Sequence, residues 1–87
     1  MKIVYHKEFV KSYKKRIAPN QKLINLFKIQ LEKFIFNSKN PNLRDHRLIG
    51  KKQNFRAFSL TGDIRIVYKI IGGEIWLFDI GSHNQVY

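Results

Sequence analysis

Residues 55–80, which read FRAFSLTGDIRIVYKIIGGEIWLFDI, decide the fold of this 87-residue chain. They contain three runs rich in Ile, Val, Phe, Tyr and Trp, the residue types that favour β-strands. The runs are separated by Thr61-Gly62-Asp63 and by Gly72-Gly73, and both separators are typical of hairpin turns. The pattern predicts an antiparallel meander of three consecutive strands, at residues 55–60, 64–71 and 74–80.

The first turn also predicts which side chains share a face of the sheet. A two-residue loop, at either Thr61-Gly62 or Gly62-Asp63, pairs odd with even positions. One face then carries Arg56, Phe58, Leu60, Arg65, Val67 and Lys69. The other face, predicted to lie under helices, carries Ala57, Ile64, Ile66, Tyr68 and Ile70. A β-bulge would reverse this assignment for part of a strand.

The first half of the chain predicts one strand and two helices. Ile3-Val4-Tyr5 is a short β-rich run, and apolar residues recur at helical spacing in residues 7–17 and 21–36. Pro19-Asn20 separates the two helices, which we expect to form a hairpin. The element order is therefore βααβββ, a two-layer α+β fold in a single domain over residues 1–87.

The composition indicates a polyanionic partner. Seventeen Lys and Arg against six Asp and Glu give a net charge of +11 and an isoelectric point near 10.2, which attracts nucleic acid. A basic surface without any nucleic-acid partner is the simpler alternative. Cysteine is absent, which excludes disulfides and thiolate chemistry. The amino terminus lacks the apolar run of a signal peptide, and Lys28, Glu32 and Lys33 interrupt the most apolar stretch, so we expect a soluble cytoplasmic protein.

The residue types of the second half suit cleavage of RNA without a metal ion. His6, His46 and His83 lie far apart with no ligand spacing, and phosphate-binding loops and serine elbows are absent, so we predict no metal and no cofactor. In metal-free cleavage the ribose 2′-hydroxyl attacks the neighbouring phosphate. Histidine can remove or donate the protons, and arginine can stabilise the charge on phosphate oxygens.

Each candidate residue also has a simpler structural interpretation. His83 fits a tail residue without function, and His46 fits a loop histidine that makes one local hydrogen bond. Arg56 and Arg65 fit solvent-facing charges on half-buried strands, and Asp63 fits a turn residue. His6 is expected to be structural. The lysines of the first helix fit a solvated face that could also meet RNA phosphates.

Three motifs, in order and over nearly the whole chain, resemble the RelE/ParE toxin superfamily and most closely its YafQ-like branch. They are Asp45-His46-Arg47-Leu48-Ile49-Gly50, similar to D-H-x-L-x-G; residues 62–68, GDIRIVY, similar to G-D-x-R-[IV]-[IV]-Y; and Gly81-Ser82-His83 followed by Val86-Tyr87. The resemblance implies a helix pair packed on a twisted antiparallel sheet. It also implies a toxin of a type II toxin–antitoxin system that cuts mRNA in the ribosomal A site.

The resemblance further implies roles for individual residues. His46, Asp63 and His83 match residues implicated in YafQ-like catalysis, Arg65 matches a phosphate-stabilising arginine, and Tyr87 matches a functional aromatic. We expect His83 to be the general acid, and His46 or Asp63 the base. The remaining predicted roles are RNA binding by Lys51, Lys52 and Arg56 and stacking of Tyr87 on a base.

Two positions depart from the YafQ-like pattern. Ser59 stands where those enzymes carry a further histidine, and Asp79 stands where they tend to carry an arginine. An acid at position 79 would repel phosphate, or would orient His83 or Arg65. The acid–base assignment and the codon preference therefore stay open.

Two other function classes compete with the nuclease. ParE-like members of the superfamily poison DNA gyrase and generally lack the histidine set, so His46 and His83 favour the nuclease. A non-catalytic RNA- or ribosome-binding module would bind without producing cleavage products. For the nuclease, the expected partners are mRNA, the ribosome and an acidic antitoxin that wraps the toxin, which a +11 surface suits; no membrane partner is expected.

Overall fold

The structure, a computed structural model, describes residues 2–87 except for the side chain of Lys51. It confirms the α+β class and the order of the predicted elements. It adds a two-residue strand, a short last helix and two 3₁₀ turns that the sequence did not predict. The elements are β1 (Ile3–Tyr5), α1 (Lys7–Arg16), α2 (Gln21–Phe36), η1 (Pro41–Leu43), β2 (His46–Arg47), η2 (Gly50–Lys52), β3 (Arg56–Ser59), β4 (Ile64–Ile71), β5 (Glu74–Ser82) and α3 (His83–Val86).

The sheet has five strands in the order β1-β5-β4-β3-β2. The predicted meander of β3, β4 and β5 is antiparallel, and β2 extends it in the same sense at one edge. At the other edge β1 runs parallel to β5, with Ile3 beside Ile75. The sheet is therefore mixed, with one parallel pair that the expected all-antiparallel sheet did not include.

The register between β3 and β4 corrects the predicted faces. Ser59 pairs with Arg65, and the Leu60 amide donates to the Ile64 carbonyl at 2.8 Å, so Thr61-Gly62-Asp63 forms a three-residue loop. A three-residue loop pairs residues of equal parity, whereas the prediction assumed two residues. Arg65, Val67 and Lys69 consequently do not share a face with Arg56, Phe58 and Leu60. Ala57 likewise moves to the face opposite Ile64, Ile66 and Tyr68.

A β-bulge in β5 lets two core residues at odd separation point the same way. Val67 pairs with Asp79 and Tyr68 with Leu77, which leaves Phe78 as the extra residue. Leu77 and Ile80 are both fully buried in the same core cluster. The extra residue thus turns the strand between them.

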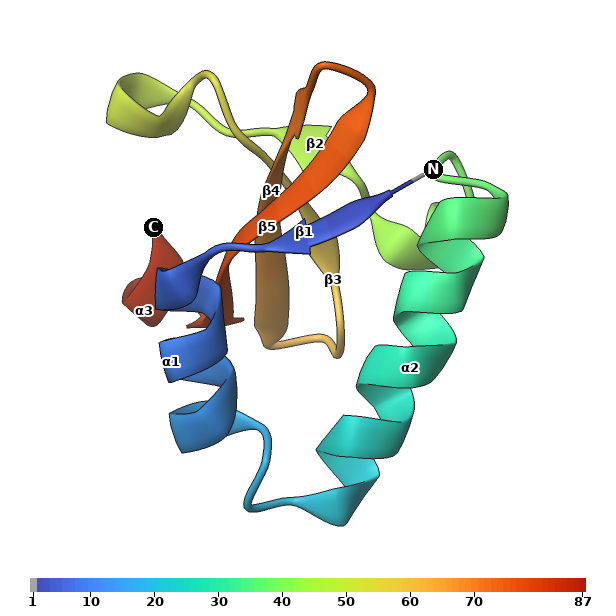
Figure 1. The fold of residues 1–87 in the computed structure, drawn as a ribbon, viewed down its shortest axis with the longest axis vertical. Coiled ribbons are helices and arrows are strands. Elements are labelled where there is room, and N and C mark those ends of the chain that lie inside the picture. The colour runs from blue at the N-terminus through green and yellow to red at the C-terminus, as the bar shows by residue number, and fades with distance from the viewer. Residues whose placement is uncertain (1) are drawn as a thin grey trace.

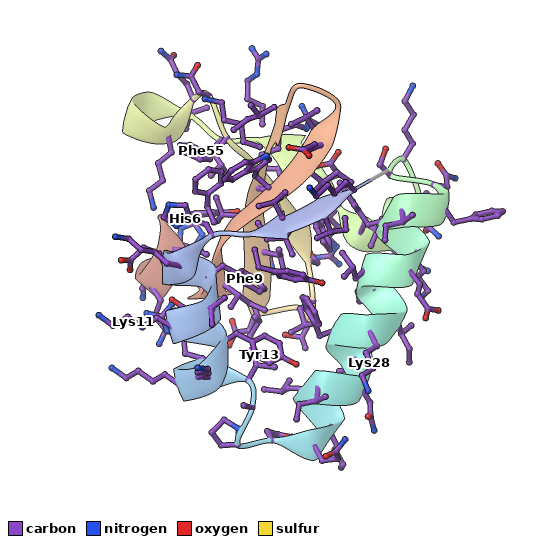
Figure 2. All side chains as sticks on the ribbon, in the orientation of Figure 1. His6, Phe9, Lys11, Tyr13, Lys28 and Phe55 are labelled. Atoms are coloured by element: carbon purple, nitrogen blue, oxygen red, sulfur yellow. The ribbon has the colours of Figure 1, made fainter. Side chains whose placement is uncertain are left out.

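The main core lies between the sheet and the helix pair (Figure 1). Phe27 of α2 packs against Phe9 and Tyr13 of α1, with ring centroids 5.8 and 5.1 Å apart. Figure 2 shows Phe9 and Tyr13 pointing into the space between the helices. Phe34 stacks on Phe58 of β3 at 4.4 Å, which joins α2 to the sheet.

The opposite face of the sheet carries a smaller cluster of Leu48, Ala57, Val67 and Val86, with Phe55 packed against it. These side chains come from the segment after β2, from β3 and β4, and from α3. In Figure 1 the η2 turn and α3 lie on the same side of the molecule, away from α2. This less covered face, which we call the open face, holds the candidate site.

Candidate active site

A four-residue helix positions the histidine and tyrosine of the carboxyl-terminal run. Ser82 caps α3 with a capping box, in which the Ser82 amide donates to Gln85 Oε1 at 2.8 Å. Gly81 lies just before it in close contact with two side chains, because a Cβ there would lie 2.6 Å from Arg16 Nη1 and 2.7 Å from Gln85 Oε1, and these would have to move. Residues four apart on a helix share a face, so α3 brings His83 beside Tyr87. Their ring centroids are 4.4 Å apart and nearly perpendicular.

Tyr87 also contacts His46 of β2, which is the edge strand farthest from β1 in the sheet. The Tyr87 hydroxyl lies 3.2 Å from His46 Nε2, and the two rings are nearly perpendicular at 6.3 Å. Two histidines 37 positions apart in the sequence therefore meet through one tyrosine. They line a pocket of about 690 Å³ on the open face, here called the histidine pocket, with Arg47, Leu48, Ile49, Lys52 and Tyr87.

The hydrogen bonds of His46 define which ring nitrogen carries the proton in its neutral form. His46 Nδ1 lies 2.8 Å from the Arg44 carbonyl, which can only accept, so Nδ1 is the protonated nitrogen. The lone pair of neutral His46 is then on Nε2, and Tyr87 is placed to donate to it. A proton acceptor held in this way is suited to general-base chemistry.

The smaller hydrophobic cluster of the open face holds two segments of the histidine pocket together. Val86 of α3 and Leu48 are both buried in it, so the segment after β2 and the last helix are packed on common neighbours. Lys52 of η2 donates to the Val86 carbonyl, which ties the η2 turn to α3. The amino group of Lys52 therefore lies at the pocket rim.

Arg65 lies on the open face of β4. Its Nη1 donates to the carbonyls of Thr61 and Gly62 at 3.1 and 2.9 Å, which holds the guanidinium across the β3–β4 loop. Burial raises the pKa of the Tyr87 hydroxyl, and the positive charge of Arg65 opposes that rise. Arg65 is thus within interaction range of the Tyr87 hydroxyl, with further guanidinium donors free of these two carbonyl contacts.

Three of the predicted site residues do not line the histidine pocket: Arg65, Asp63 and Arg56. Asp63 is exposed in the three-residue loop, where its amide donates to Thr61 Oγ1. Arg56 is engaged with Asp45, donating from Nε and Nη2 at 3.3 and 3.2 Å. The structure does not describe the side chain of Lys51, so its predicted role lies outside the described residues.

Asp45 is a residue to which the sequence analysis assigned no role. Besides Arg56, it accepts a 2.6 Å hydrogen bond from the hydroxyl of Tyr68, a buried residue of β4. Burial and the bond to Asp45 raise the pKa of Tyr68, and the same carboxylate raises the pKa of Arg56. The network fixes the backbone immediately before His46. The only sign of this role in the sequence was the position of Asp45 in the Asp45–Gly50 motif, because its partners Arg56 and Tyr68 are distant in sequence.

Comparison with known proteins shows the family to which the chain belongs. Residues 1–87 match the family model described as "Bacterial toxin of type II toxin-antitoxin system, YafQ". The chain belongs to the YafQ toxin family. Compared by sequence with curated proteins, it matches none.

Solved structures of YafQ and related toxins have the same fold. A metal-bound toxin from Helicobacter pylori is 27% identical with a TM-score of 0.79, over 100% of this chain and 99% of that one. YafQ from E. coli strain BL21(DE3) is 20% identical with a TM-score of 0.82, over 98% and 96% of the two chains. A structure of the E. coli DinJ–YafQ complex gives 21% identity and a TM-score of 0.80 over the same shares.

The two departures from the YafQ-like pattern have defined surroundings. Ser59 is buried, and among the described residues its hydroxyl has no hydrogen-bond partner. Asp79 accepts from its neighbour's amide, Ile80, at 2.9 Å and pairs with Arg16 of α1 at 3.4 Å. Arg16 also donates to the Ile80 carbonyl at 2.8 Å. The partner of Asp79 is thus a helix arginine, and no hydrogen bond or ion pair links Asp79 to His83 or Arg65 in the described structure.

Two further findings on the described residues concern metal binding and membrane-spanning helices. No group of three or more His, Cys, Asp or Glu side chains within them is arranged to hold a metal ion. Their helices are too short or too polar to cross a bilayer.

Proposed function

We propose that this YafQ-family toxin is an endoribonuclease that cleaves mRNA without a metal ion. The observation that carries the proposal is the meeting of His46 and His83 on Tyr87 in one pocket rimmed by Lys52 and Arg47. Two histidines can divide proton removal and proton donation between them at neutral pH. The cations suit a phosphodiester, whose charge grows as the phosphorus is attacked.

The reaction is a transfer within the RNA strand. His46 Nε2 takes the proton of the ribose 2′-hydroxyl, and the 2′-oxygen attacks the adjacent phosphorus. The bond from phosphorus to the 5′-oxygen of the next nucleotide breaks, and His83 donates a proton to that oxygen. The products are a 2′,3′-cyclic phosphate and a 5′-hydroxyl. His46 is assigned as base ahead of Asp63 because it lines the pocket and presents a lone pair there.

Arg65, Lys52 and Tyr87 support this chemistry without moving protons. Arg65 is held by backbone carbonyls next to Tyr87, where its remaining donors can bind a non-bridging phosphate oxygen. Lys52 adds a second positive charge at the rim. The Tyr87 ring is partly exposed and offers a surface on which a base can stack.

The cellular setting follows from the substrate. A YafQ-family member that cuts mRNA would act in the cytoplasm, in the A site of translating ribosomes, where the codon is single-stranded and its bases are accessible. An acidic antitoxin would silence it, as a solved complex joins E. coli YafQ to DinJ. A net charge of +11 suits such a partner.

Primer extension on mRNA in a purified translation reaction tests the proposal. Wild-type protein should give discrete cuts in register with codons, and His83→Ala should abolish them. His6→Asn is the matched control, because asparagine can replace the cap that His6 Nδ1 provides to the Glu8 amide. Intact mRNA in the presence of the wild-type protein would contradict the nuclease, and DNA gyrase inhibition would then be measured.

Dependence on metal is tested separately, because ribosomes themselves need Mg²⁺. A short ribosome-free RNA is incubated with high protein in the presence of EDTA. Cleavage that persists, and that ends in 2′,3′-cyclic phosphate, supports the mechanism. Cleavage that requires added metal would refute it.

A further inference from the structure

A second cleft adjoins the histidine pocket along residues 47–49. It has a volume of about 670 Å³ and shares Arg47, Leu48 and Ile49 with the pocket. Its own walls include Gln53, Asn54, Phe55, Arg56 and Lys69. We call it the flanking cleft. Because the two hollows share three consecutive residues, a chain leaving the histidine pocket over this segment enters the flanking cleft directly.

The flanking cleft contains an aromatic ring that is held in place and partly accessible. Phe55 packs edge-on against Phe78, with centroids 5.0 Å apart and an angle of 80°. The ammonium of Lys69 lies over the Phe55 ring, 5.6 Å from its centroid. Phe78 is the extra residue of the bulge in β5. The ring is therefore fixed from behind and carries a positive charge on its face.

The polar groups of the flanking cleft match a nucleotide. Arg47 and Lys69 supply positive charge for a phosphate, and none of the described residues lining the cleft is acidic. Arg56 adds to the wall, although Asp45 already occupies two of its donors. Gln53 and Asn54 are exposed, and each side-chain amide offers both donors and an acceptor for the edge of a base.

We propose that the flanking cleft binds an RNA nucleotide next to the cleaved linkage. Its phosphate lies against Lys69 and Arg47, its base lies against the Phe55 ring, and Gln53 and Asn54 read the base edge. This site deepens the proposed function and rests on it, since the histidine pocket defines which linkage is cut. The flanking cleft thus contributes to sequence preference without taking part in the chemistry.

Binding of uncleavable RNA separates the flanking cleft from catalysis. Oligoribonucleotides of two, four and six residues, 2′-O-methylated throughout, lack the attacking hydroxyl, and their affinities are measured by fluorescence anisotropy. Wild-type protein should gain affinity as the strand lengthens beyond two residues. Lys69→Ala should bind the dinucleotide as the wild type does, but its affinity for the longer strands should be lower than that of the wild type by roughly fivefold or more. Its slope of log affinity against log salt should be shallower by about 0.7, the value for one lost single-strand phosphate contact.

Lys28→Ala is the charge-matched control. Lys28 is an exposed lysine of α2, on the far side of the molecule from Phe55 (Figure 2), so it removes the same charge without touching the flanking cleft. The Gln53→Ala/Asn54→Ala double variant should bind four-residue strands of different sequence more evenly than the wild type does. Thermal melts confirm that each variant is folded.

The outcomes test the nucleotide site in the flanking cleft separately from the proposed nuclease activity. If unmodified RNA is cut but Lys69→Ala binds long strands as Lys28→Ala does, the flanking cleft is not a nucleotide site and the proposed function stands. If no RNA is cut and Lys69→Ala still loses the length-dependent gain, the nucleotide site stands and the nuclease proposal fails.

Discussion

Tyr87 connects the two histidines of the pocket, and its protonation state determines what it can do there. Burial raises the pKa of its hydroxyl, and the neighbouring Arg65 opposes the rise without cancelling it. The hydroxyl therefore keeps its proton at neutral pH and donates to His46 Nε2. In the free protein this bond occupies the lone pair that the proposed base would use. A substrate ribose must displace the tyrosine hydroxyl before its own proton can be removed.

Separate Tyr87 variants distinguish the hydroxyl from the ring. Tyr87→Phe keeps the ring beside His83 and removes the bond to His46, so we expect single-turnover cleavage to change by less than about fivefold. Tyr87→Ala also removes the proposed stacking surface, which is worth about 1–3 kcal/mol per base, and cleavage should fall by roughly 5–150-fold. Both rates are measured on one RNA at saturating protein.

The ratio of the cleavage rates of Tyr87→Phe and Tyr87→Ala decides between a role for the hydroxyl and a role for the ring. A phenylalanine variant as inactive as the alanine variant would assign a chemical role to the hydroxyl and contradict a role in stacking alone. Comparison of the two melting temperatures excludes a difference in folding.

At the scale of elements, α3 depends on the close approach of Arg16 and Gln85 to Gly81. In Gly81→Ala the new methyl group would displace Arg16 from the Ile80 carbonyl or Gln85 from the Ser82 amide. Loss of a helix cap costs about 1 kcal/mol, so the midpoint of urea unfolding should fall. Cleavage should fall as well, because α3 carries both His83 and Tyr87.

Gly62→Ala is the control for this substitution. No atom lies within 4 Å of a Cβ at Gly62, so its effect on the free energy of unfolding should stay within about 0.5 kcal/mol. Equal effects of the two substitutions would show that the contacts of Gly81 do not hold α3.

The Asp45–Arg56–Tyr68 network anchors β2, which has only two residues and few contacts of its own. Tyr68→Phe removes a hydrogen bond to a charged group, and we expect a loss of about 1–3 kcal/mol at neutral pH. The wild-type protein should also lose stability in alkali. The pKa of Tyr68 is raised in the folded state, while in the unfolded chain the phenol titrates near pH 10.

The pH dependence has a definite sign. Below about pH 10 both states hold the phenolic proton, so the folded state keeps the full benefit of the Tyr68 hydrogen bond. Above that pH the unfolded state ionises first, and stability falls as pH rises toward the raised pKa. Urea melts at neutral pH and near pH 11 should therefore show a smaller alkaline loss in Tyr68→Phe than in wild type. Tyr5→Phe, at an exposed tyrosine, should behave as wild type.

Elements long enough to show a repeat could be predicted from the sequence. α2 and β4 have the bounds that apolar spacing and turn residues indicated. The two residues of β2 and the four of α3 are too few to show a period, so neither was predicted. The face assignment was wrong because one residue in the Thr61–Asp63 loop reverses the parity of a whole strand. The parallel pairing of β1 with β5 joins the two ends of the chain and has no local signal.

The candidate site was predictable only through motifs. His46, His83, Lys52 and Tyr87 do line one pocket, but the sequence did not show that Tyr87 links the histidines. Arg56, expected to hold RNA, forms an ion pair with Asp45 that the sequence did not indicate. Ion pairs between residues far apart in the chain depend on the register of the sheet, and a single sequence does not fix that register.

At the scale of the whole molecule, positive side chains far outnumber the acidic side chains that could pair with them. Three of the six acidic side chains form ion pairs among the described residues, Glu74 with Lys2, Asp79 with Arg16 and Asp45 with Arg56. Net positive charge of this size makes the compact state repel itself. Salt screens that repulsion, because the Debye length falls to about 10 Å at 0.1 M. The melting temperature of the isolated toxin should therefore rise with salt.

An acidic antitoxin should have the opposite salt dependence. At about one hundred times its Kd it would stabilise the toxin by roughly 2.7 kcal/mol, which raises the melting temperature by roughly 10–20 °C in a domain of this size. Scanning calorimetry of toxin and complex at low and high salt measures both effects. The increment given by the antitoxin should shrink as salt rises, while the toxin alone becomes more stable. An increment that salt does not change would instead show that apolar contacts hold the antitoxin. Phe36 and Ile49, 93% and 90% exposed, are the most exposed large apolar side chains among the described residues.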